Sequence, residues 1–388
     1  MTIKEQLEIL RGEPIRTWTG DPLKIPCIET SDPEKLCRHP VVSVNMITYN
    51  HEPFIRQAIE GVMMQKTDFE FELVIGEDCS SDRTREICFE YQKRYPDKIR
   101  VLWAEQNVYK LGGNSRRCLA HSRGEFIAFC EGDDYWIDPL KLQRQVSSLR
   151  ENPDVALSFG DAYRFEEASR RLFKYWGSHP EWRQAGKIPG MAFCEGMLLG
   201  YRISTLTVMV RRSVLECVQK EDQILSWRLS LGDYQRWISI AKRHPAWNCT
   251  HRFGVYRISG TGATTLSRAQ LIVDVPLVDM YYIMTKVMPS QYYELSVCRL
   301  IWSRIRARHT VGKILDDVEQ YNSKVAAEFK ISPSIVSILS FGKSRTILQF
   351  LLLTRILVKI VRLEGMHSLF GKFTRKLFKM RQYANVDV

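Results

Sequence analysis

The 388-residue chain lacks the long apolar runs that direct or anchor a protein to a membrane. The opening MTIKEQLEILRGEPIRTW has no apolar stretch of signal-peptide length. No segment reaches the roughly 18 to 20 uninterrupted apolar residues of a membrane-spanning helix. The nearest candidate, residues 346–361, is interrupted by Arg355 and Lys359. With 45% hydrophobic and 26% charged residues, the chain is expected to be a cytoplasmic globular protein.

Two kinds of binding motif are missing as well. The ten cysteines are scattered, and none has the C-x-x-C spacing of a zinc ribbon, so we expect reduced, structural thiols. No G-x-G-x-x-G follows the first β-rich segment, and no G-x-x-x-x-G-K-S/T occurs. These absences exclude the Rossmann and P-loop ways of holding a nucleotide phosphate.

From residue 41 onward, β-rich segments alternate with helical ones, which predicts an α/β fold with a mainly parallel sheet flanked by helices. The predicted strands are 41–48, 71–78, 99–104, 125–132, 155–162 and 248–259. The predicted helices are 52–65, 82–95, 114–122, 139–152 and one that starts at 232–233. A strand followed by a helix is predicted within 204–215, and a long surface loop at 174–191.

The pattern divides the chain into three predicted parts. Residues 1–40 form an extension that packs on the main domain, which spans residues 41–266. Residues 267–388 form a helical C-terminal region with no turn-rich repeat.

Polar clusters follow three of the predicted strands, at residues 48–52, 77–82 and 131–134. The carboxyl ends of parallel strands meet at one edge of a sheet, where ligands of open α/β folds bind. Carboxylates repel phosphate, but they bind Mg²⁺ or Mn²⁺, which can bridge to a nucleotide diphosphate. For residues 131–134 alone, a turn with a helix cap before Pro139 is the structural alternative.

Five segments resemble, in order, the successive motifs of the family-two inverting glycosyltransferases. They read VSVNMITYNHEPFIRQAIEGVMMQ, FELVIGEDCSSDRT, EQN, SRGEFIAFCEGDDYWIDPLKLQRQV and LGDYQRW. The resemblance covers about residues 41–260. It implies the A-type nucleotide-sugar-binding fold for this catalytic domain, and a nucleotide-diphospho-sugar as donor.

The resemblance also implies roles for the polar clusters. It assigns the nucleotide base to Asp78, with Glu77 beside it. The nucleotide pocket is implied to be lined by Thr48, Tyr49, Asn50 and Glu52. The metal motif of the family falls on Glu131, Gly132 and Asp133 and is continued by Asp134. The resemblance therefore implies Mg²⁺ or Mn²⁺ as cofactor. It also implies that Asp133 is one of the residues that bind the nucleotide-sugar donor.

The sequence departs from the family pattern at both acidic motifs, because Glu77 and Glu131 stand where Asp is usual. A longer carboxylate still reaches a cation, so these changes tune the site without removing it. The Q-x-x-R-W motif of processive synthases is absent, which favours transfer of a single sugar over polymerisation.

An inverting displacement needs a carboxylate that takes the proton of the acceptor hydroxyl. The family's base falls on Asp233, at the start of a predicted helix; the structural alternative is a helix N-cap. Arg117, with Arg116 beside it, is a candidate for contact with the diphosphate, and a solvated helix face is the alternative.

The C-terminal tail carries much of the positive charge. From Lys343 onward there are ten basic and two acidic residues, which supply eight of the twelve net charges. A basic amphipathic helix of this kind can lie on an anionic membrane, here on its inner face. A saccharide or lipid-linked acceptor, as in cell-surface polysaccharide or lipopolysaccharide assembly, would fit; packing on the catalytic domain is the alternative. No recognition motif accompanies the charge, so no nucleic-acid partner is expected.

Two other functions stay open from the residues alone. The chain could be an inactive nucleotide-sugar-binding assembly subunit, which the presence of both the metal cluster and Asp233 disfavours. It could also be a metal-dependent nucleotidyltransferase, which would carry a Gly-rich phosphate loop where this sequence reads TYNHEPF.

Overall fold

The structure is a computed structural model, and it describes residues 27–108, 113–174, 184–198, 203–221 and 232–259. The chain divides into two compact units, Met1–Leu271 and Ile272–Val388, and all described residues belong to the first. Most of the N-terminal extension, half of the loop expected at 174–191 and the basic C-terminal tail lie outside the described residues.

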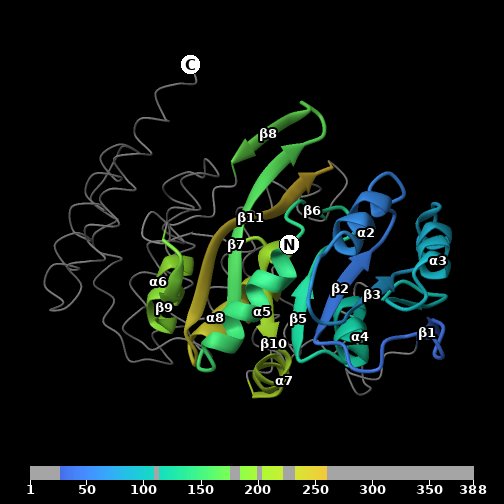
Figure 1. The fold of residues 1–388 in the computed structure, drawn as a ribbon. Helices are drawn as coiled ribbons and strands as arrows, with labels where there is room; N and C mark the ends of the chain where they lie inside the picture. The colour runs from blue at the N-terminus through green and yellow to red at the C-terminus, as the bar shows by residue number, and fades with distance from the viewer. Residues whose placement is uncertain (1–26, 109–112, 175–183, 199–202, 222–231, 260–388) are drawn as a thin grey trace, which may run out of the picture. The chain divides into compact units, whose positions relative to one another are not determined.

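The described unit is built on one mixed sheet of eleven strands (Figure 1), in the order β1-β4-β3-β2-β5-β10-β7-β11-β6, with β8 beside β7 and β9 beside β11. Four neighbouring strands of its first half are parallel: β3 pairs with β4, and β2 pairs with both β3 and β5, while β1 runs antiparallel to β4. These four strands are β2 (Val42–Thr48), β3 (Phe71–Glu77), β4 (Ile99–Trp103) and β5 (Phe126–Phe129). The predicted α/β fold with a mainly parallel central sheet is confirmed.

Helices connect these strands and cover both faces of the sheet. They are α2 (Ile55–Met63), α3 (Thr84–Arg94), α4 (Gly113–His121) and α5 (Lys141–Glu151). Leu73 and Ile75 belong to a large buried core that includes apolar residues of α2, α3 and α5. Val74, between them, belongs to a second cluster with Cys118 of α4. Alternate side chains of one strand are thus buried on opposite faces, which explains why strands of this half are apolar almost throughout.

The second half of the sheet contains antiparallel pairs that the sequence pattern did not predict. The strand β10 (Met209–Arg211) runs antiparallel to β5 and to β7 (Leu157–Glu166). The long strand β11 (Ala246–Ile258) runs parallel to β7. The short strands that were missed are β1 (Ile28–Thr30), β6 (Tyr135–Trp136), β8 (Arg171–Lys174) and β9 (Gly186–Ile188).

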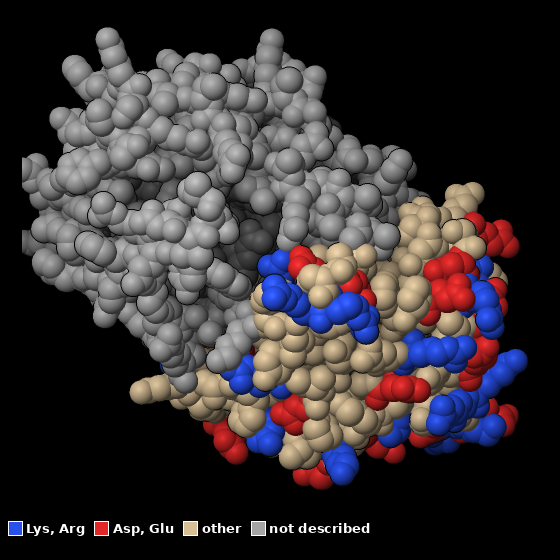
Figure 2. Space-filling view, turned by 90° about the horizontal axis from the view of Figure 1, so that it is seen from above, with Lys and Arg blue, Asp and Glu red and all other residues tan. Residues whose placement is uncertain are grey.

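Three further helices and one 3-10 turn complete the unit: α6 (Gly190–Leu198), α7 (Arg212–Glu221), α8 (Gly232–Ala241) and η3 (Thr205–Thr207). None of the helices in the described ranges is long and apolar enough to cross a membrane. On the face seen in Figure 2, acidic and basic side chains of the described residues are interspersed.

One cation lies inside the apolar core. Lys141, in the first turn of α5, is fully buried. Its Nζ donates to Gln145 Oε1 (2.7 Å) and lies 4.1 Å from the ring centroid of Trp136. Burial lowers the pKa of Lys141 from 10.5 to about 7, because the charged form loses its hydration.

Replacement of this lysine by an apolar side chain should stabilise the protein. Between pH 7 and 10.5 the unfolded chain holds a proton on Lys141 that the folded chain releases, so stability rises with pH there, and the penalty is complete below pH 7. We expect Lys141→Met to raise the free energy of unfolding by about 1 to 4 kcal/mol at pH 6.5.

The gain should shrink steadily towards pH 10, as measured by urea denaturation at several pH values. Lys66→Met, at an exposed lysine, is the control and should show no such trend. If the change in unfolding free energy caused by Lys141→Met did not vary with pH, Lys141 would not be a group that releases its proton on folding.

Candidate active site

Three strand ends meet at one edge of the sheet. In the parallel register, Thr48 of β2 is the partner of Glu77 of β3. The pairing continues past the strands, because Asp78 N donates to Thr48 O (3.1 Å) and Gly132 N donates to Ile47 O (2.9 Å). The structure therefore brings together the three polar clusters that the sequence predicts at the strand ends.

The loops after β2 and β3 are bonded to each other. Asn50 adopts a positive φ of 53°, and its Oδ1 accepts the backbone N–H of Ser81 (2.8 Å). Glu52 Oε2 accepts the backbone N–H of Arg83 (3.1 Å). Two of the four predicted pocket residues thus fix the loops, while Tyr49, just before Asn50, is 46% exposed.

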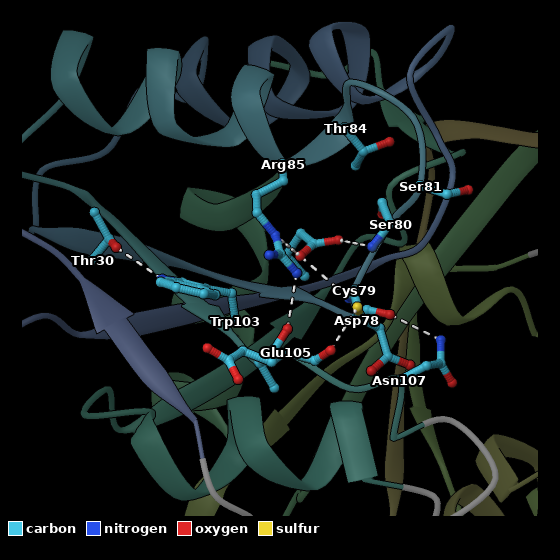
Figure 3. A network of polar contacts seen from close by, with 12 residues as sticks. Thr30, Asp78, Cys79, Ser80, Ser81, Thr84, Arg85, Trp103, Glu105 and Asn107 are labelled. Atoms are coloured by element: carbon cyan, nitrogen blue, oxygen red, sulfur yellow. Dashed lines mark hydrogen bonds and ion pairs between the residues drawn. The ribbon is translucent and has the colours of Figure 1, made fainter.

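Glu77 is a buried carboxylate that folds the loop after β3. It accepts from Arg85 Nε (2.6 Å) and from the backbone N–H of Ser80 (2.6 Å); Arg85 and Ser80 are labelled in Figure 3. The guanidinium of Arg85 also lies 4.9 Å from the ring centroid of Trp103. Both carboxylate oxygens of Glu77 have partners in the protein. Glu77 therefore supports the loop that carries Asp78, the predicted base-binding residue.

Asp78 lies between this loop and the segment after β4 (Figure 3). Its Oδ1 accepts the backbone N–H of Val108 (2.8 Å), and its backbone oxygen accepts from Asn107 Nδ2 (2.9 Å). Asn107 is the last residue of the EQN motif. The loop after β3 and the EQN motif after β4 are therefore in direct contact.

The two arginines of α4 lie in different surroundings. Arg117 is only 1% exposed, and its Nη2 donates to the backbone oxygen of Glu77 and to Asn114 Oδ1 (both 2.7 Å). Its Nε and Nη1 are buried and have no hydrogen-bond partner among the described residues. Burial lowers the pKa of Arg116, and the charge of Arg236 lowers it further. Arg117 thus supports the loop after β3, and Arg116 lies near Arg236.

The acidic segment after β5, residues 131–134, is called the acid turn from here on. It approaches the loop after β2 so closely that a Cβ on Gly132 would lie 2.6 Å from Thr48 Oγ1 and 2.9 Å from His51 Nδ1. Only a glycine therefore fits where the acid turn crosses the loop after β2.

His51 lies beside the acid turn, because its Nε2 is 3.9 Å from Asp133 Oδ2. Burial lowers the pKa of His51, and the nearby carboxylates only partly offset that effect.

The three acids of the turn differ in their partners. Asp134 is buried, and its Oδ1 accepts the backbone N–H of Arg257 in β11 (2.8 Å). Glu131 Oε2 is buried and has no hydrogen-bond partner within the described ranges. Burial, with Asp133 beside it, raises the pKa of Glu131 to about 8. A divalent cation would supply the missing partner and reverse that effect, so Glu131 and Asp133 fit such an ion.

These acids do not form a complete metal site by themselves. Among the described residues, no group of three or more His, Cys, Asp or Glu side chains is placed to hold a metal ion. Mg²⁺ and Mn²⁺ are commonly bound by one or two carboxylates together with substrate phosphates and water.

Asp233 lies in the first turn of α8 and accepts a hydrogen bond from Thr205 Oγ1 (2.6 Å). Its charge contributes to the raised pKa of Glu131, which places the two carboxyl groups within electrostatic reach of each other. One turn later, Trp237 packs edge-on against Phe129 of β5, with ring centroids 5.4 Å apart. This contact fixes α8 next to the strand that ends in the acid turn.

Sequence reasoning missed two residues of this region, Thr205 and Arg236. Burial lowers the pKa of the Arg236 guanidinium, and the charges of Asp233 and Glu131 oppose that shift. Arg236 stands three residues after Asp233, so helical spacing could have placed it on the same face. Thr205 comes from η3, for which the sequence offers no periodic signal.

Comparison with known proteins agrees with this geometry. Residues 43–218 match the family model "Glycosyl transferase family 2". An uncharacterized protein of Mycobacterium tuberculosis, Rv1520, is 42% identical over 118 residues, which is 30% of this chain and 34% of that protein. The chain thus spans about a third of the length of that relative.

A longer match is to WfgD of Escherichia coli, named UDP-Glc:alpha-D-GlcNAc-diphosphoundecaprenol beta-1,3-glucosyltransferase. It is 28% identical over 265 residues, which cover 64% of this chain and 92% of WfgD.

Solved structures share the fold at low sequence identity. TarS 1-349 of S. aureus in complex with UDP-GlcNAc has a TM-score of 0.52 at 17% identity, over 73% of this chain and 83% of TarS 1-349. The mannosyltransferase PcManGT of Pyrobaculum calidifontis, in complex with GDP-Man and Mn²⁺, has a TM-score of 0.50 at 15% identity, over 96% of this chain and 93% of PcManGT.

The supporting role of Glu77 can be tested by its stability effect. Glu77→Gln keeps the shape but removes the charge that Arg85 and two backbone N–H groups contact. We expect the free energy of unfolding to fall by about 2 to 3 kcal/mol in urea denaturation. Glu90→Gln, in the exposed pair with Arg56, is the control and should change it little. Equal effects of the two variants would contradict the role given to Glu77.

Proposed function

The chain belongs to glycosyl transferase family 2, and on that premise we propose that it moves a single sugar from a nucleotide-diphospho-sugar to an acceptor hydroxyl, with inversion at the anomeric carbon. The observation that carries this proposal is the meeting of Asp78, the acid turn and Asp233 around the carboxyl ends of β3 and β5. A nucleotide loop, a cation-binding pair and a base are the parts that this chemistry needs.

The donor nucleotide is proposed to bind at the loop after β3. Asp78 would contact the base, with the backbone around it held by Val108 and Asn107. Thr48, Tyr49, Asn50 and Glu52 would form the wall next to it, and Tyr49 is the exposed side chain among them. Arg117 and Glu77 would act from beneath, by holding the loop in shape. The complexes of TarS with UDP-GlcNAc and of PcManGT with GDP-Man support a nucleotide-sugar as donor.

Glu131 and Asp133 are proposed to hold Mg²⁺ or Mn²⁺, with the remaining ligands from the donor phosphates and water. The Mn²⁺ complex of PcManGT supports this assignment. When bound, the cation would stabilise the departing diphosphate. Asp134 was also a candidate ligand; because its Oδ1 is bonded to Arg257 N, we leave it out of the proposed set.

Asp233 is proposed to take the proton of the acceptor hydroxyl. The hydrogen bond from Thr205 Oγ1 fixes the orientation of its carboxylate. The position of Asp233 in the first turn of α8, on a helix anchored to β5, would hold the base beside the sugar.

The acceptor is proposed to be a saccharide or a lipid-linked saccharide of cell-surface polysaccharide assembly. WfgD, whose name states a diphosphoundecaprenol-linked acceptor, supports this class. Peripheral membrane contact through the basic C-terminal tail stays part of the proposal, and it concerns residues outside the described ranges.

A thermal-shift screen of nucleotide-sugars, each with and without Mn²⁺, tests the function directly. The proposal expects at least one nucleotide-diphospho-sugar to raise the melting temperature in a Mn²⁺-dependent way. No shift with any UDP-, GDP-, dTDP- or CDP-linked sugar would overturn it.

Asp133→Ala should abolish Mn²⁺-dependent nucleotide binding, because it removes one of the two proposed cation ligands. Calorimetry with UDP and GDP, in Mn²⁺ and in EDTA, provides the measurement. Asp154→Ala, at an exposed acid paired with Lys187, is the matched control and should bind normally. Unchanged Mn²⁺-dependent affinity in Asp133→Ala would remove this acid from the site.

Asp233→Asn should stop transfer without preventing donor binding. The amide oxygen can still accept the hydrogen bond from Thr205, but the side chain can no longer take a proton. We expect kcat to fall by about 10²- to 10⁴-fold, with donor affinity nearly unchanged in calorimetry. Turnover close to that of the unmodified protein would rule out Asp233 as the base.

A further inference from the structure

Arg257, near the end of β11, bonds to three separate parts of the chain. Its Nε donates to the backbone oxygen of Asp133 (2.8 Å), and its Nη2 donates to Gln57 Oε1 of α2 (2.5 Å). Its Nη1 is paired with Glu167, which follows β7. The side chain is only 7% exposed, so these partners enclose its charge.

Three aromatic rings complete the surroundings of Arg257. The guanidinium lies 4.7 Å from the ring centroid of Phe54, 5.1 Å from that of Tyr135 and 5.9 Å from that of Phe165. Arginine is attracted to the faces of such rings, more strongly where water is excluded. Since all three guanidinium nitrogens also have hydrogen-bond or ion-pair partners, the whole group is occupied by contacts within the protein.

The main chain of the same residue adds a second bond to the acid turn. The backbone N–H of Arg257 donates to Asp134 Oδ1 (2.8 Å), while the side chain holds the backbone oxygen of Asp133. Two consecutive residues of the turn are thus tied to one residue that lies more than a hundred positions later in the sequence. The other two carboxylates of the acid turn, those of Glu131 and Asp133, are the ones proposed above to hold the cation.

We propose that Arg257 is a positioning residue that fixes the shape of the acid turn and thereby sets its affinity for a divalent cation. The part that concerns the cation rests on the proposed function; the part that concerns the shape of the turn does not. Residues that orient metal ligands without touching the metal typically change its affinity by about 10- to 100-fold when replaced.

Lysine cannot replace arginine in this role. A guanidinium directs its N–H groups in a planar fork, so one side chain reaches Asp133 O, Gln57 and Glu167 at once. An ammonium is a single point of charge on a flexible stem. It would keep the pair with Glu167 and release the backbone of Asp133, because the half-buried carboxylate of Glu167 attracts an ammonium more strongly than a carbonyl oxygen does.

The test compares Arg257→Lys with Arg100→Lys. Arg100 is also buried, and it bonds to Glu29, Glu72 and the backbone oxygen of His121. Its partner Glu72 lies near the amino end of β3, away from the acid turn. Both variants should lower the melting temperature, so Arg100→Lys controls for the loss of a buried arginine fork.

Two measurements separate positioning from general stability. Hydrogen exchange reports on the backbone of residues 130–136, and electron paramagnetic resonance measures the binding of Mn²⁺ alone. In Arg257→Lys we expect faster exchange in residues 130–136 and an Mn²⁺ Kd about 10- to 100-fold higher. Arg100→Lys should show neither change. Glu167→Gln, which removes the charge that Arg257 Nη1 is paired with and leaves the acid turn unchanged, should show the same two changes to a smaller degree.

The outcomes distinguish this inference from the proposed function. Unchanged exchange of residues 130–136 in both Arg257→Lys and Glu167→Gln would overturn the positioning role, whatever the metal data show. Faster exchange with an unchanged, Glu131-dependent Mn²⁺ affinity would overturn the link to the cation. If the unmodified protein binds no Mn²⁺ that Glu131→Gln removes, the proposed cation site falls, and the exchange data alone decide whether Arg257 holds the turn.

Discussion

The parallel pairing of β2 with β3 on one side and with β5 on the other is the constraint on which the site depends. It places Thr48 opposite Glu77 and extends past the strands through the bonds from Asp78 N to Thr48 O and from Gly132 N to Ile47 O. A shift of one residue in this register would move every side chain of a strand to the opposite face of the sheet. Because both faces are packed against helices, the core enforces the register, and the register brings the acidic loops together.

Several carboxylates lie close together at this edge of the sheet, and three of them are stabilised by different partners. Glu77 is neutralised by Arg85, Asp78 accepts a backbone N–H, and Asp134 is bonded to the backbone of β11. Of the buried carboxylate oxygens in the described part of the chain, Glu131 Oε2 is the one left without a hydrogen bond. A buried, unsatisfied acid costs stability, and this cost falls where the proposed cation would bind.

The parallel half of the sheet could be predicted from sequence because its strands are continuous apolar runs that alternate with helices, and the polar residues at their ends followed from that prediction. The antiparallel pairing of the other half could not, and its strands β6, β8 and β9 have only two to four residues and show no measurable period. The roles of Thr205 and Arg257 were equally out of reach. Their partners, Asp233 and Asp133, are 28 and 124 positions away, and a single sequence carries no signal for such contacts.

These long-range contacts divide the site into two physical parts. The loops that surround Asp78 are built within residues 42–108 and α4, by the strand pairing and by bonds between neighbouring loops. Asp233 and the support of the acid turn come from α8, η3 and β11, and they contact the first part through Trp237 on Phe129 and through Arg257 on the turn. Changes in the later segments can therefore alter the surroundings of Asp233 and the acid turn while the loop around Asp78 keeps its own support. If the proposed roles hold, donor recognition and transfer are separable by mutation, because different parts of the chain stabilise the residues proposed for each.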